Sequence, residues 1–525
     1  TLGRPARDRN SGQTVRHGDF SSLQDSGQYV VEVPGLGQSY PFIIGENVYR
    51  QTLTNTVRSY SLQRSNTYIN DSITGLEIKY GHKQDAQARM FFSDDFHKKG
   101  DLLDASGGWY DAGDYGKYIP PAAVAVAQML LAYELRPDVF EVGQLDFPFD
   151  IPEDDRVLPD LLAELKFELE WMERMQRPDG VVYHKVAGLH WPGFIRPEAD
   201  TQTRYVLGMS TYGTAQYAAV MAMAARVYRD LIPEFADRML RNAELAYEYL
   251  ANNPKPEFRT DEGQNTGSGG YDKTTDAEER FWALAELFKT TGDERYHEQL
   301  MSNHNRLISR SPEFVTWYDA QALGQWAYYT AAGAAEEEKT VIRRQFVRFA
   351  DAQLRNIERD GYNNILDARE YTWASAKNAV AKGNLLIMAN YMEPKQEYIN
   401  GAIDQLHNVL GRSATSYSYV TGAGTRFPRN HHHRILQSTK AYVPGFLVGG
   451  PNRYGGDPDL DRYLKEQKPA PAMAYLDISG SWSSNEFAVD YTAPLVFMLA
   501  HFADSSLFDQ NLDANSDEPG LRPEM

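Results

Sequence analysis

Hydrophobic positions recur along most of the chain with the period of an α-helix. Leucines are spaced by three and four residues between Leu158 and Leu169, a pattern that predicts an amphipathic helix over 157–175. The segment 121–135 is apolar on nearly every side, which is typical of a fully buried helix. The same reasoning predicts helices at 46–63, 211–229, 233–251, 276–289, 294–305, 320–334, 338–357, 375–391, 396–410 and 485–503.

These helices follow one another through long loops rich in glycine, proline and aromatic residues. Long loops between packed helices are usually functional. We therefore expect an all-α fold, an (α/α)6 toroid with inner and outer rings of six helices, whose loops form a cleft on one face. An α-solenoid has the same helical periodicity, but the chain shows no repeat of fixed length. We assign 45–508 to this barrel and 509–525 to an acidic, loose C-terminal tail.

The first 44 residues have a different pattern. Apolar and polar residues alternate at 28–33 and again at 40–44, on either side of a Pro-Gly-Leu-Gly turn, which predicts two or three short strands. So few strands do not make a stable sheet alone. We expect 1–44 to be a partial β module, with 40–44 packed against the barrel and 1–20 poorly anchored.

Composition excludes several classes of protein. The 525 residues carry a net charge of −19, which repels polyanions and argues against nucleic-acid binding. No apolar run is long enough to span a membrane. The absence of cysteine rules out disulfides, a thiol nucleophile and thiolate zinc ligands. The 33 tyrosines and 8 tryptophans favour either an ordinary large core or the amphipathic surfaces that carbohydrate sites use.

The densest motif is GGWYDAGDYGKY at 107–118, in which Asp111 and Asp114 stand among glycines and aromatic residues. Glycines let a backbone bend sharply and come close to a ligand. The motif precedes the buried helix at 121–135, so it lies at the mouth of a ring. Two interpretations remain: the aspartates cap the following helix, or they face a ligand in the cleft.

A third carboxylate, Glu486, occurs in the sequence NEFAVDY, where the pattern predicts that it opens the last apolar helix. Acidic residues at a helix N-terminus are often only partners of the helix dipole. Together with Asp111 and Asp114, however, Glu486 would complete what glycoside hydrolysis requires. That reaction needs one protonated acid to deliver a proton and one ionised base to hold a water.

A tract of three histidines, 431–433, ends at Arg434. Such a tract is one type of metal-binding sequence. Adjacent residues of an extended loop point to opposite sides, however, so three neighbours rarely bind one ion. Neutral histidine and arginine donors are equally suited to sugar hydroxyls.

Taken together, these motifs resemble glycoside hydrolase family 9, the inverting cellulases. The resemblance includes GGWYDAGD, the block at 159–186, YVTGAGTRFPRNHHHR, LVGGPN and SNEFAVDYTAPLVFMLA. The matches occur in the family's order and extend from about residue 30 to 503. The segment 27–49 resembles the last strands of the immunoglobulin-like module that precedes the barrel in one subgroup, here truncated.

The resemblance implies a role for each carboxylate. Asp114 would be the general base that activates a water, and Asp111 would help to hold that water. Glu486 would be the general acid, which requires its surroundings to raise its pKa. In inverting enzymes of this kind the acid and base lie about 6.5–9.5 Å apart.

The resemblance also implies a set of substrate-binding residues. His432 and Arg434 match the family's His-x-Arg signature, and the remaining positions match aromatic residues beside the acid or under the glucose rings: Tyr491, Trp317 and Trp373. The chain departs from the family at Tyr115 for histidine, His431 for proline and Lys377 for arginine. The last change loses bidentate hydrogen bonding.

A calcium cofactor is implied by the segment 271–287, which resembles the family's calcium-binding block. Asp276, Glu278 and Glu279 offer the hard oxygens that Ca²⁺ prefers. The alternative is that these acids only complement the dipole of the helix that they begin. The zinc site that some members build with cysteine is impossible here.

The resemblance therefore implies a secreted, monomeric endo-β-1,4-glucanase that acts on cellulose or a related β-glucan by inversion. One alternative keeps the fold but changes the cut, giving an exo-acting cellobiohydrolase, a β-glucosidase or a glucosaminidase. Another is a non-catalytic glucan-binding scaffold, which would be expected to have lost Asp114 or Glu486. Both are present.

Overall fold

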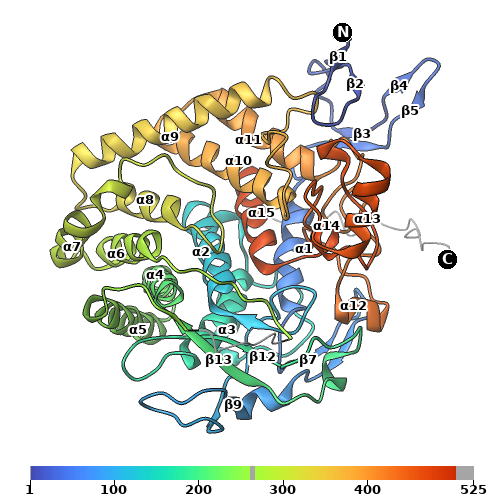
Figure 1. The fold of residues 1–525 in the computed structure, drawn as a ribbon. Helices are drawn as coiled ribbons and strands as arrows, with labels where there is room; N and C mark the ends of the chain where they lie inside the picture. The colour runs from blue at the N-terminus through green and yellow to red at the C-terminus, as the bar shows by residue number, and fades with distance from the viewer. Residues whose placement is uncertain (1, 260–266, 504–525) are drawn as a thin grey trace.

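Two concentric rings of helices make up the barrel (Figure 1). The structure is a computed structural model and describes residues 2–259 and 267–503. The inner ring consists of α2 (Ile119–Leu135), α4 (Thr211–Tyr228), α6 (Ala277–Thr291), α8 (Gln321–Thr330), α10 (Ser375–Met392) and α15 (Val489–Phe502). The outer ring consists of α1 (Arg50–Ser61), α3 (Asp160–Arg174), α5 (Pro233–Asn252), α7 (Glu294–His304), α9 (Glu336–Ile357) and α11 (Gln396–Val409). The predicted (α/α)6 toroid is confirmed.

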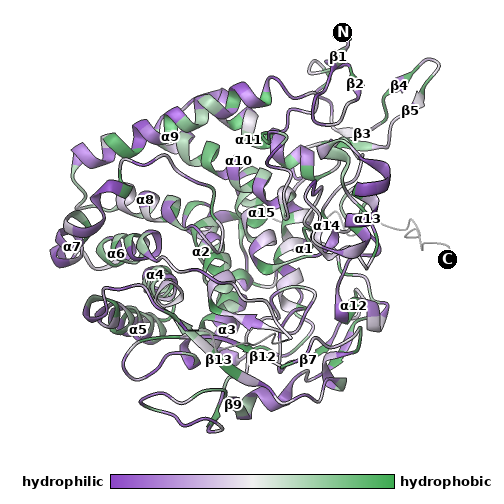
Figure 2. Cartoon of the chain, in the orientation of Figure 1, coloured by the Kyte–Doolittle hydropathy of each residue, from purple (hydrophilic) through white to green (hydrophobic). Residues whose placement is uncertain are grey.

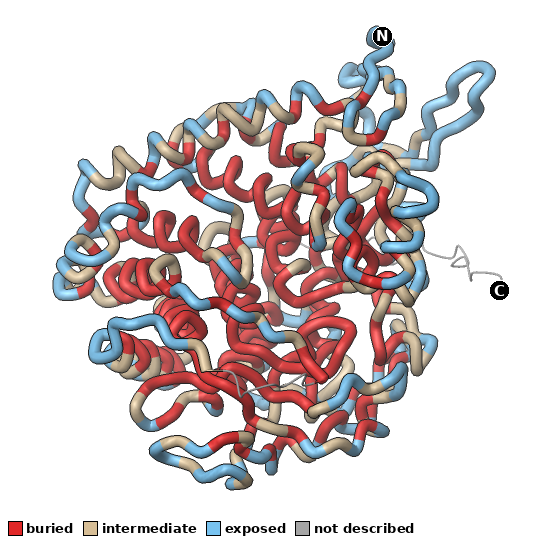
Figure 3. Tube along the Cα trace, viewed as in Figure 1, coloured by how far each residue is buried: buried red, intermediate tan, exposed pale blue. Residues whose placement is uncertain are grey.

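Burial separates the two rings. The inner helix α2 buries an unbroken run from Ile119 to Ala132, whereas the outer helix α9 buries only Ile342, Phe346, Ala350 and Ile357 along one face. Figure 2 shows the apolar residues concentrated on the inner helices, and Figure 3 shows the same helices buried along most of their length. The inner ring forms the core and carries the loops that build the site.

The loops of the barrel contain a small sheet that the sequence pattern did not predict. Its strands run in the order β10 (Leu102–Leu103), β9 (Ala88–Met90), β13 (Tyr205–Ser210), β12 (Tyr183–Ala187) and β11 (Lys117–Tyr118), and β14 (Phe258–Arg259) pairs with β13. Lys117 lies opposite Val186, and Tyr205 lies opposite Arg89. Strands this short lack a readable alternation. Because β11 begins three residues after Asp114, the sheet helps to position the candidate base.

Short elements complete the region that follows α11 in the chain. They are α12 (Arg434–Thr439), α13 (Pro458–Gln467) and α14 (Trp482–Asn485). A separate hairpin joins β7 (Tyr68–Asn70) to β8 (Glu77–Lys79). In the described part of the chain no helix is both long and apolar enough to cross a bilayer.

The N-terminal segment forms hairpins but packs differently from the prediction. Strands β3 (Gly27–Tyr29), β4 (Glu32–Val33) and β6 (Phe42–Ile44) lie where alternation predicted strands, and β3 pairs with β6. Strand β4 pairs with β5 (Gly37–Gln38), which the pattern had assigned to the turn. An earlier pair joins β1 (Ala6–Arg7) to β2 (Thr14–Val15). The β4–β5 hairpin projects from the barrel (Figure 1), and Ile43 is 67% exposed. The expectation that 40–44 packs against the barrel was therefore wrong.

The expectation that 1–20 is poorly anchored was wrong as well. Asp8 and Ser11 are buried, Asn10 donates its side-chain amide to Asp360 at 2.9 Å, and the Ala472 amide donates to the Asn10 carbonyl at 2.9 Å. Polar side chains fasten this segment, so hydrophobic patterning gave no sign of it. The proposed tail, 509–525, lies outside the described residues.

Candidate active site

A cavity of about 920 Å³ opens at the loop face of the barrel. All eight residues that the sequence analysis assigned to catalysis or substrate binding line it: Asp111, Asp114, Glu486, His432, Arg434, Tyr491, Trp317 and Trp373. They come from segments that are far apart in the sequence, most of them loops; Arg434 begins α12 and Tyr491 lies in α15. Ligand sites are typically concave, with a few convergent polar groups among aromatic walls, and this cavity has that character.

The loop that carries Asp111 and Asp114 is held from behind by helix α3. The Trp109 amide donates to Glu168 at 2.6 Å, and the Trp109 indole donates to Glu164 at 2.7 Å. Both glutamates are buried and lie one helical turn apart, on one face of α3. Glu164 and Glu168 thus support the glycine-rich loop from the outer ring.

A buried ion cluster fixes the other end of the same loop. The Lys117 ammonium lies 2.8 Å from Asp85, and the Arg204 guanidinium lies 2.8 Å from the other oxygen of that carboxylate. Arg204 also donates to the Tyr115 carbonyl, and Lys117 donates to the Gly107 carbonyl. Burial alone would raise the pKa of Asp85, but Arg204 and Lys117 outweigh it and lower that pKa to about 2.

The sequence pattern predicted that Glu486 opens a helix, but in the structure it does not. Its backbone is extended, between the end of α14 and the start of α15. Bridges pair Glu486 with His432 and Ala488 with Ala112, so main-chain pairing fixes the acid loop against the loop of the aspartates. The Gly113 amide donates to the Glu486 carboxylate at 3.1 Å.

Gly113 is required at this junction. A Cβ atom on that residue would lie 2.3 Å from the His432 carbonyl oxygen and 2.8 Å from the Glu486 carboxylate. No side chain fits such a space, and only glycine lets the backbone approach so closely. The glycine of the DAGD motif therefore sets the separation between the two acidic loops.

Glu486 and Asp111 both have raised pKa values in the cleft. Burial, reinforced by the charge of Asp114, raises the pKa of Glu486 to about 8. Burial and the same neighbouring charge also raise the pKa of Asp111 well above its usual range. Glu486 therefore keeps its proton at neutral pH, as a general acid must.

Two tyrosines complete the aspartate site, and the sequence analysis did not assign them. The Tyr271 hydroxyl donates to Asp111 at 2.5 Å, and the Tyr118 hydroxyl donates to Asp114 at 3.0 Å. The other Asp111 oxygen, Oδ1, is buried without a hydrogen-bond partner among the described residues. An oxygen in that position is free to bind a water in the cleft. Tyr118 lies within the GGWYDAGDYGKY motif, so its place in the sequence was the available signal.

The three histidines have separate environments. His432 lines the cleft and shares a hydrogen bond with the Ser479 carbonyl through Nδ1 at 2.7 Å. His433 lies on the other side and contacts Gln63 at 3.1 Å, while both ring nitrogens of His431 are buried without a partner among the described residues. Their divergence argues against a shared metal ion. Arg434 anchors its loop by donating to the Gly113 carbonyl at 3.0 Å.

Aromatic side chains form the walls of the cleft. Trp373 is 42% exposed, and Trp317 packs edge-on against Tyr271 with ring centroids 5.0 Å apart. The cleft contains further aromatic residues that the sequence analysis did not assign: Trp191, Phe314, Tyr318 and Trp482. Exposed ring faces beside polar groups suit the alternating apolar and hydroxyl surfaces of a sugar.

The lysine that replaces the family's arginine has an acidic partner in the cleft. The Lys377 ammonium lies 3.6 Å from Asp490, and both residues are buried and line the cavity. Neither carboxylate oxygen of Asp490 accepts a hydrogen bond from the described residues. These oxygens are therefore able to accept hydrogen bonds from sugar hydroxyls.

The acids expected to bind calcium have cationic partners within the chain. The Lys273 ammonium lies 2.6 Å from Glu279 and 3.7 Å from Glu278, and it donates to the Tyr318 carbonyl at 2.6 Å. Asp276 pairs with Arg280 at 2.9 Å. An internal ammonium thus occupies the position between the glutamates that a cation would take. Across residues 2–259 and 267–503, no three His, Cys, Asp or Glu side chains gather as metal ligands.

Comparison with known proteins places the chain among cellulases. The model of glycosyl hydrolase family 9 matches residues 49–499. Endoglucanase D of Acetivibrio thermocellus is 32% identical over 501 residues, which cover 94% of this chain and 76% of the relative. The xyloglucan-specific endo-β-1,4-glucanase BoGH9A of Bacteroides ovatus is 31% identical, with 91% of this chain and 82% of the relative covered.

Solved structures agree with the sequence comparison. The crystal structure of the GH family 9 endoglucanase J30 matches with a TM-score of 0.94 and 48% identity, covering 96% of this chain and 93% of that one. AaCel9A, solved with cellobiose-like isofagomine, matches with a TM-score of 0.83 and 28% identity, with 93% of each chain covered. The fold and the family match over residues 49–499 lead to one conclusion: the chain belongs to glycosyl hydrolase family 9.

Proposed function

We propose that the protein is an endo-β-1,4-glucanase that hydrolyses cellulose or a related β-glucan with inversion at the anomeric carbon. The observation that carries this proposal is the pairing of a protonated Glu486 with the Asp111–Asp114 pair across one aromatic cleft. Inverting glycosidases use one carboxylic acid to protonate the leaving oxygen and one carboxylate to activate water. The relatives named as endoglucanases support the choice of substrate.

The reaction is a single displacement. Glu486 donates its proton to the glycosidic oxygen, and the bond from that oxygen to the anomeric carbon breaks. Asp114, as carboxylate, takes a proton from a water whose oxygen bonds to the same carbon from the opposite face. Glu486 ends ionised and Asp114 ends protonated, and exchange of protons with solvent restores both.

Asp111 and its tyrosine hold the water in this scheme. Tyr271 occupies one oxygen of Asp111, which leaves Oδ1 for the water. Burial raises the pKa of Asp111 well above its usual range, which favours the protonated form of this group. Asp111 therefore positions the nucleophile while Asp114 removes its proton.

Activity should decline as the pH rises through about 8, because that is the pKa to which burial raises Glu486. Only the protonated acid is active, so kcat/KM should fall about tenfold per pH unit above that value. The measurement is a pH profile on a soluble cello-oligosaccharide at concentrations well below KM. An alkaline limb near pH 4–5, the ordinary range of glutamate, would exclude Glu486 as the acid.

The stereochemical test follows the first product by proton NMR. Inversion predicts that cleavage of a β-linked cello-oligosaccharide first releases the α-anomer, which then mutarotates. Initial release of the β-anomer would indicate retention and a covalent intermediate. That outcome would overturn the assignment of Asp114 as a base.

The endo mode has its own test. Random internal cleavage should lower the viscosity of carboxymethylcellulose long before reducing ends accumulate. The exo-acting alternatives predict the reverse, with cellobiose or glucose released while viscosity persists. A glucosaminidase would instead cleave chito-oligosaccharides in preference to cello-oligosaccharides of equal length.

We infer further that the enzyme works outside the cell and as a single chain. Polymeric β-glucan does not cross a membrane, so its hydrolysis takes place where the polymer lies. One chain supplies all eight assigned residues of the cleft, which supports action as a monomer. Sedimentation of the active enzyme tests the second inference.

A further inference from the structure

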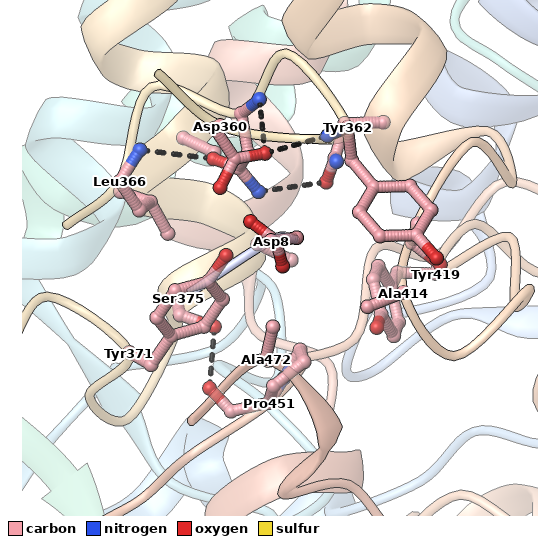
Figure 4. Close-up of a pocket in the computed structure, with 15 residues that line it drawn as sticks. Asp8, Asp360, Tyr362, Leu366, Tyr371, Ser375, Ala414, Tyr419, Pro451 and Ala472 are labelled. Carbon is pink, nitrogen blue, oxygen red and sulfur yellow. Dashed lines mark hydrogen bonds between the residues drawn. The ribbon is translucent and has the colours of Figure 1, made fainter. Parts of the chain in front are cut away.

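The small cavity where the N-terminal segment meets the barrel contains two carboxylates that the chain itself satisfies (Figure 4). Its volume is about 20 Å³, and Asp8 and Asp360 line it. Every oxygen of both carboxylates accepts a hydrogen bond, and the donors lie in the adjoining loops: Asn10, Ser11, Gly361, Tyr362 and Asn364. These carboxylates therefore indicate no ligand.

The rim of the catalytic cleft presents a different case, because large apolar side chains remain exposed there. Trp191, Phe194 and Ile195 are 54%, 44% and 38% exposed. They belong to one loop, residues 188–196, which connects β12 to the short helix η4 (Pro197–Ala199) and is called the rim loop below. Single exposed apolar side chains are common, but a cluster of them bordered by polar groups marks an interaction site.

Hydrogen bonds to two carbonyls hold the rim loop in place. The Tyr115 hydroxyl donates to the Ile195 carbonyl at 2.5 Å, and the Arg434 guanidinium donates to the Pro192 carbonyl at 2.8 Å. Tyr115 is buried and directly follows Asp114 in the chain, so the loop is fastened to the catalytic motif. A surface that is ordered before its ligand arrives loses less conformational entropy on binding.

The rim loop is continuous with the substrate-binding residues of the cleft. The His432 ring makes edge-on contacts with two aromatic rings, with centroid distances of 5.2 Å to Phe194 and 5.7 Å to Trp482. The Arg434 guanidinium lies 5.4 Å from the centroid of the Trp191 ring, and Trp191 itself lines the cleft. The exposed side chains therefore extend an existing surface and do not form a separate one.

The chemistry of this surface matches a glucose unit. A β-1,4-linked glucose presents C–H groups on its two faces and hydroxyls around its edge. Aromatic rings are suited to such an apolar body with a polar margin, and His432 and Arg434 supply polar groups beside them. The same combination continues from the centre of the cleft to the rim loop.

Given the β-glucanase function proposed above, we propose that Trp191 and Phe194 bind one more glucose unit of a long chain at the rim of the cleft, and that Tyr115 is the positioning residue of this site. The site gives a role to one departure from the family pattern, since Tyr115 stands where many members have histidine. It should favour long chains over short ones, because a short chain that fills the centre of the cleft does not reach the rim loop.

The length of the substrate tests this site. We compare variants by the ratio of kcat/KM on cellohexaose to kcat/KM on cellotetraose. Trp191→Ala should lower that ratio about tenfold, the loss expected when an aromatic stacking partner is removed. Tyr115→Phe should lower it less, about threefold, because only the hydroxyl that holds the Ile195 carbonyl is lost.

Two controls separate positioning from a general loss of structure. Tyr40→Ala removes an equally exposed aromatic side chain from the N-terminal segment, and the ratio should keep its wild-type value. Adding Tyr115→Phe to Trp191→Ala should lower the ratio no further, because residues that act through one another are not additive. A structural defect would instead lower the Tm and reduce kcat/KM equally on both substrates.

Binding without catalysis distinguishes this site from the proposed function. In the Glu486→Gln background, calorimetry should give a Kd for cellohexaose that Trp191→Ala raises about tenfold. Such binding by a chain that does not cleave β-glucan would support the rim site and overturn the proposed function. Cleavage by the wild type, combined with an unchanged ratio and an unchanged Kd in Trp191→Ala, would overturn the rim site and leave the proposed function standing.

Discussion

Replacing Glu486 by glutamine should lower turnover on an unactivated β-1,4-glucan by about 10²–10⁴-fold, the usual contribution of general acid catalysis. The amide keeps the shape of the side chain but carries no acidic proton. Because the backbone bridge to His432 holds the loop in place, folding should be unaffected. The measurement is kcat on cello-oligosaccharides, together with the Tm of wild type and variant.

The leaving group distinguishes this acid from a structural residue. An aryl cellobioside with a good leaving group needs little protonation, so Glu486→Gln should retain much more of its activity on that substrate. Asp114→Asn should lose a similar factor on both substrates, because water still requires a base. Glu278→Gln, at an acid outside the cleft, should behave as wild type. Equal losses on both substrates for Glu486→Gln would contradict its role.

The helices were the most predictable part of the structure, because burial imposes a period on the sequence. The segment predicted at 375–391 is α10 (Ser375–Met392), and that predicted at 338–357 is α9 (Glu336–Ile357). The last helix was predicted at 485–503, but α15 begins later, at Val489. Glu486 and Ala488, which the pattern placed in this helix, instead pair with the loops at His432 and Ala112. A long-range backbone bridge leaves no local pattern.

The candidate site was predictable as a set of residues but not as an arrangement. The motifs named the eight residues that converge on the cleft. They did not indicate that Tyr271 would come from a distant loop to bind Asp111. The surroundings of Glu278 and Glu279 were not predictable either, since only the fold shows that the Lys273 ammonium lies close to both glutamates.

The N-terminal segment shows the limit of hydrophobic patterning most clearly. Its apolar positions at Leu36 and Ile43 are exposed, whereas the polar residues Asp8 and Asn10 make the contacts with the barrel. Polar anchoring depends on which partners the fold brings near. The sequence contains no periodic signal for such partners.

The largest stability effect is expected at Asp85, which lies behind the catalytic loop. Asp85→Asn should destabilise the fold by about 3–5 kcal/mol, because removing one member of a buried ion cluster leaves the others without compensation. Lys117 and Arg204 would then be two buried cations with a neutral partner. The same substitution at Asp104, whose pair with Arg174 is about half exposed, should cost no more than about 1 kcal/mol.

The pH dependence gives this prediction a signature that simple misfolding would lack. The pKa of Asp85 is about 2 in the folded protein and about 3.9 in an unfolded chain. Its contribution to stability is therefore complete above pH 4–5 and is lost as the pH falls toward 2. In thermal unfolding, the stabilities of wild type and Asp85→Asn should differ most near neutral pH, and this difference in stability should become smaller at acidic pH. A gap that stays constant from pH 7 to pH 3 would show that the loss comes from packing and not from the charge of Asp85.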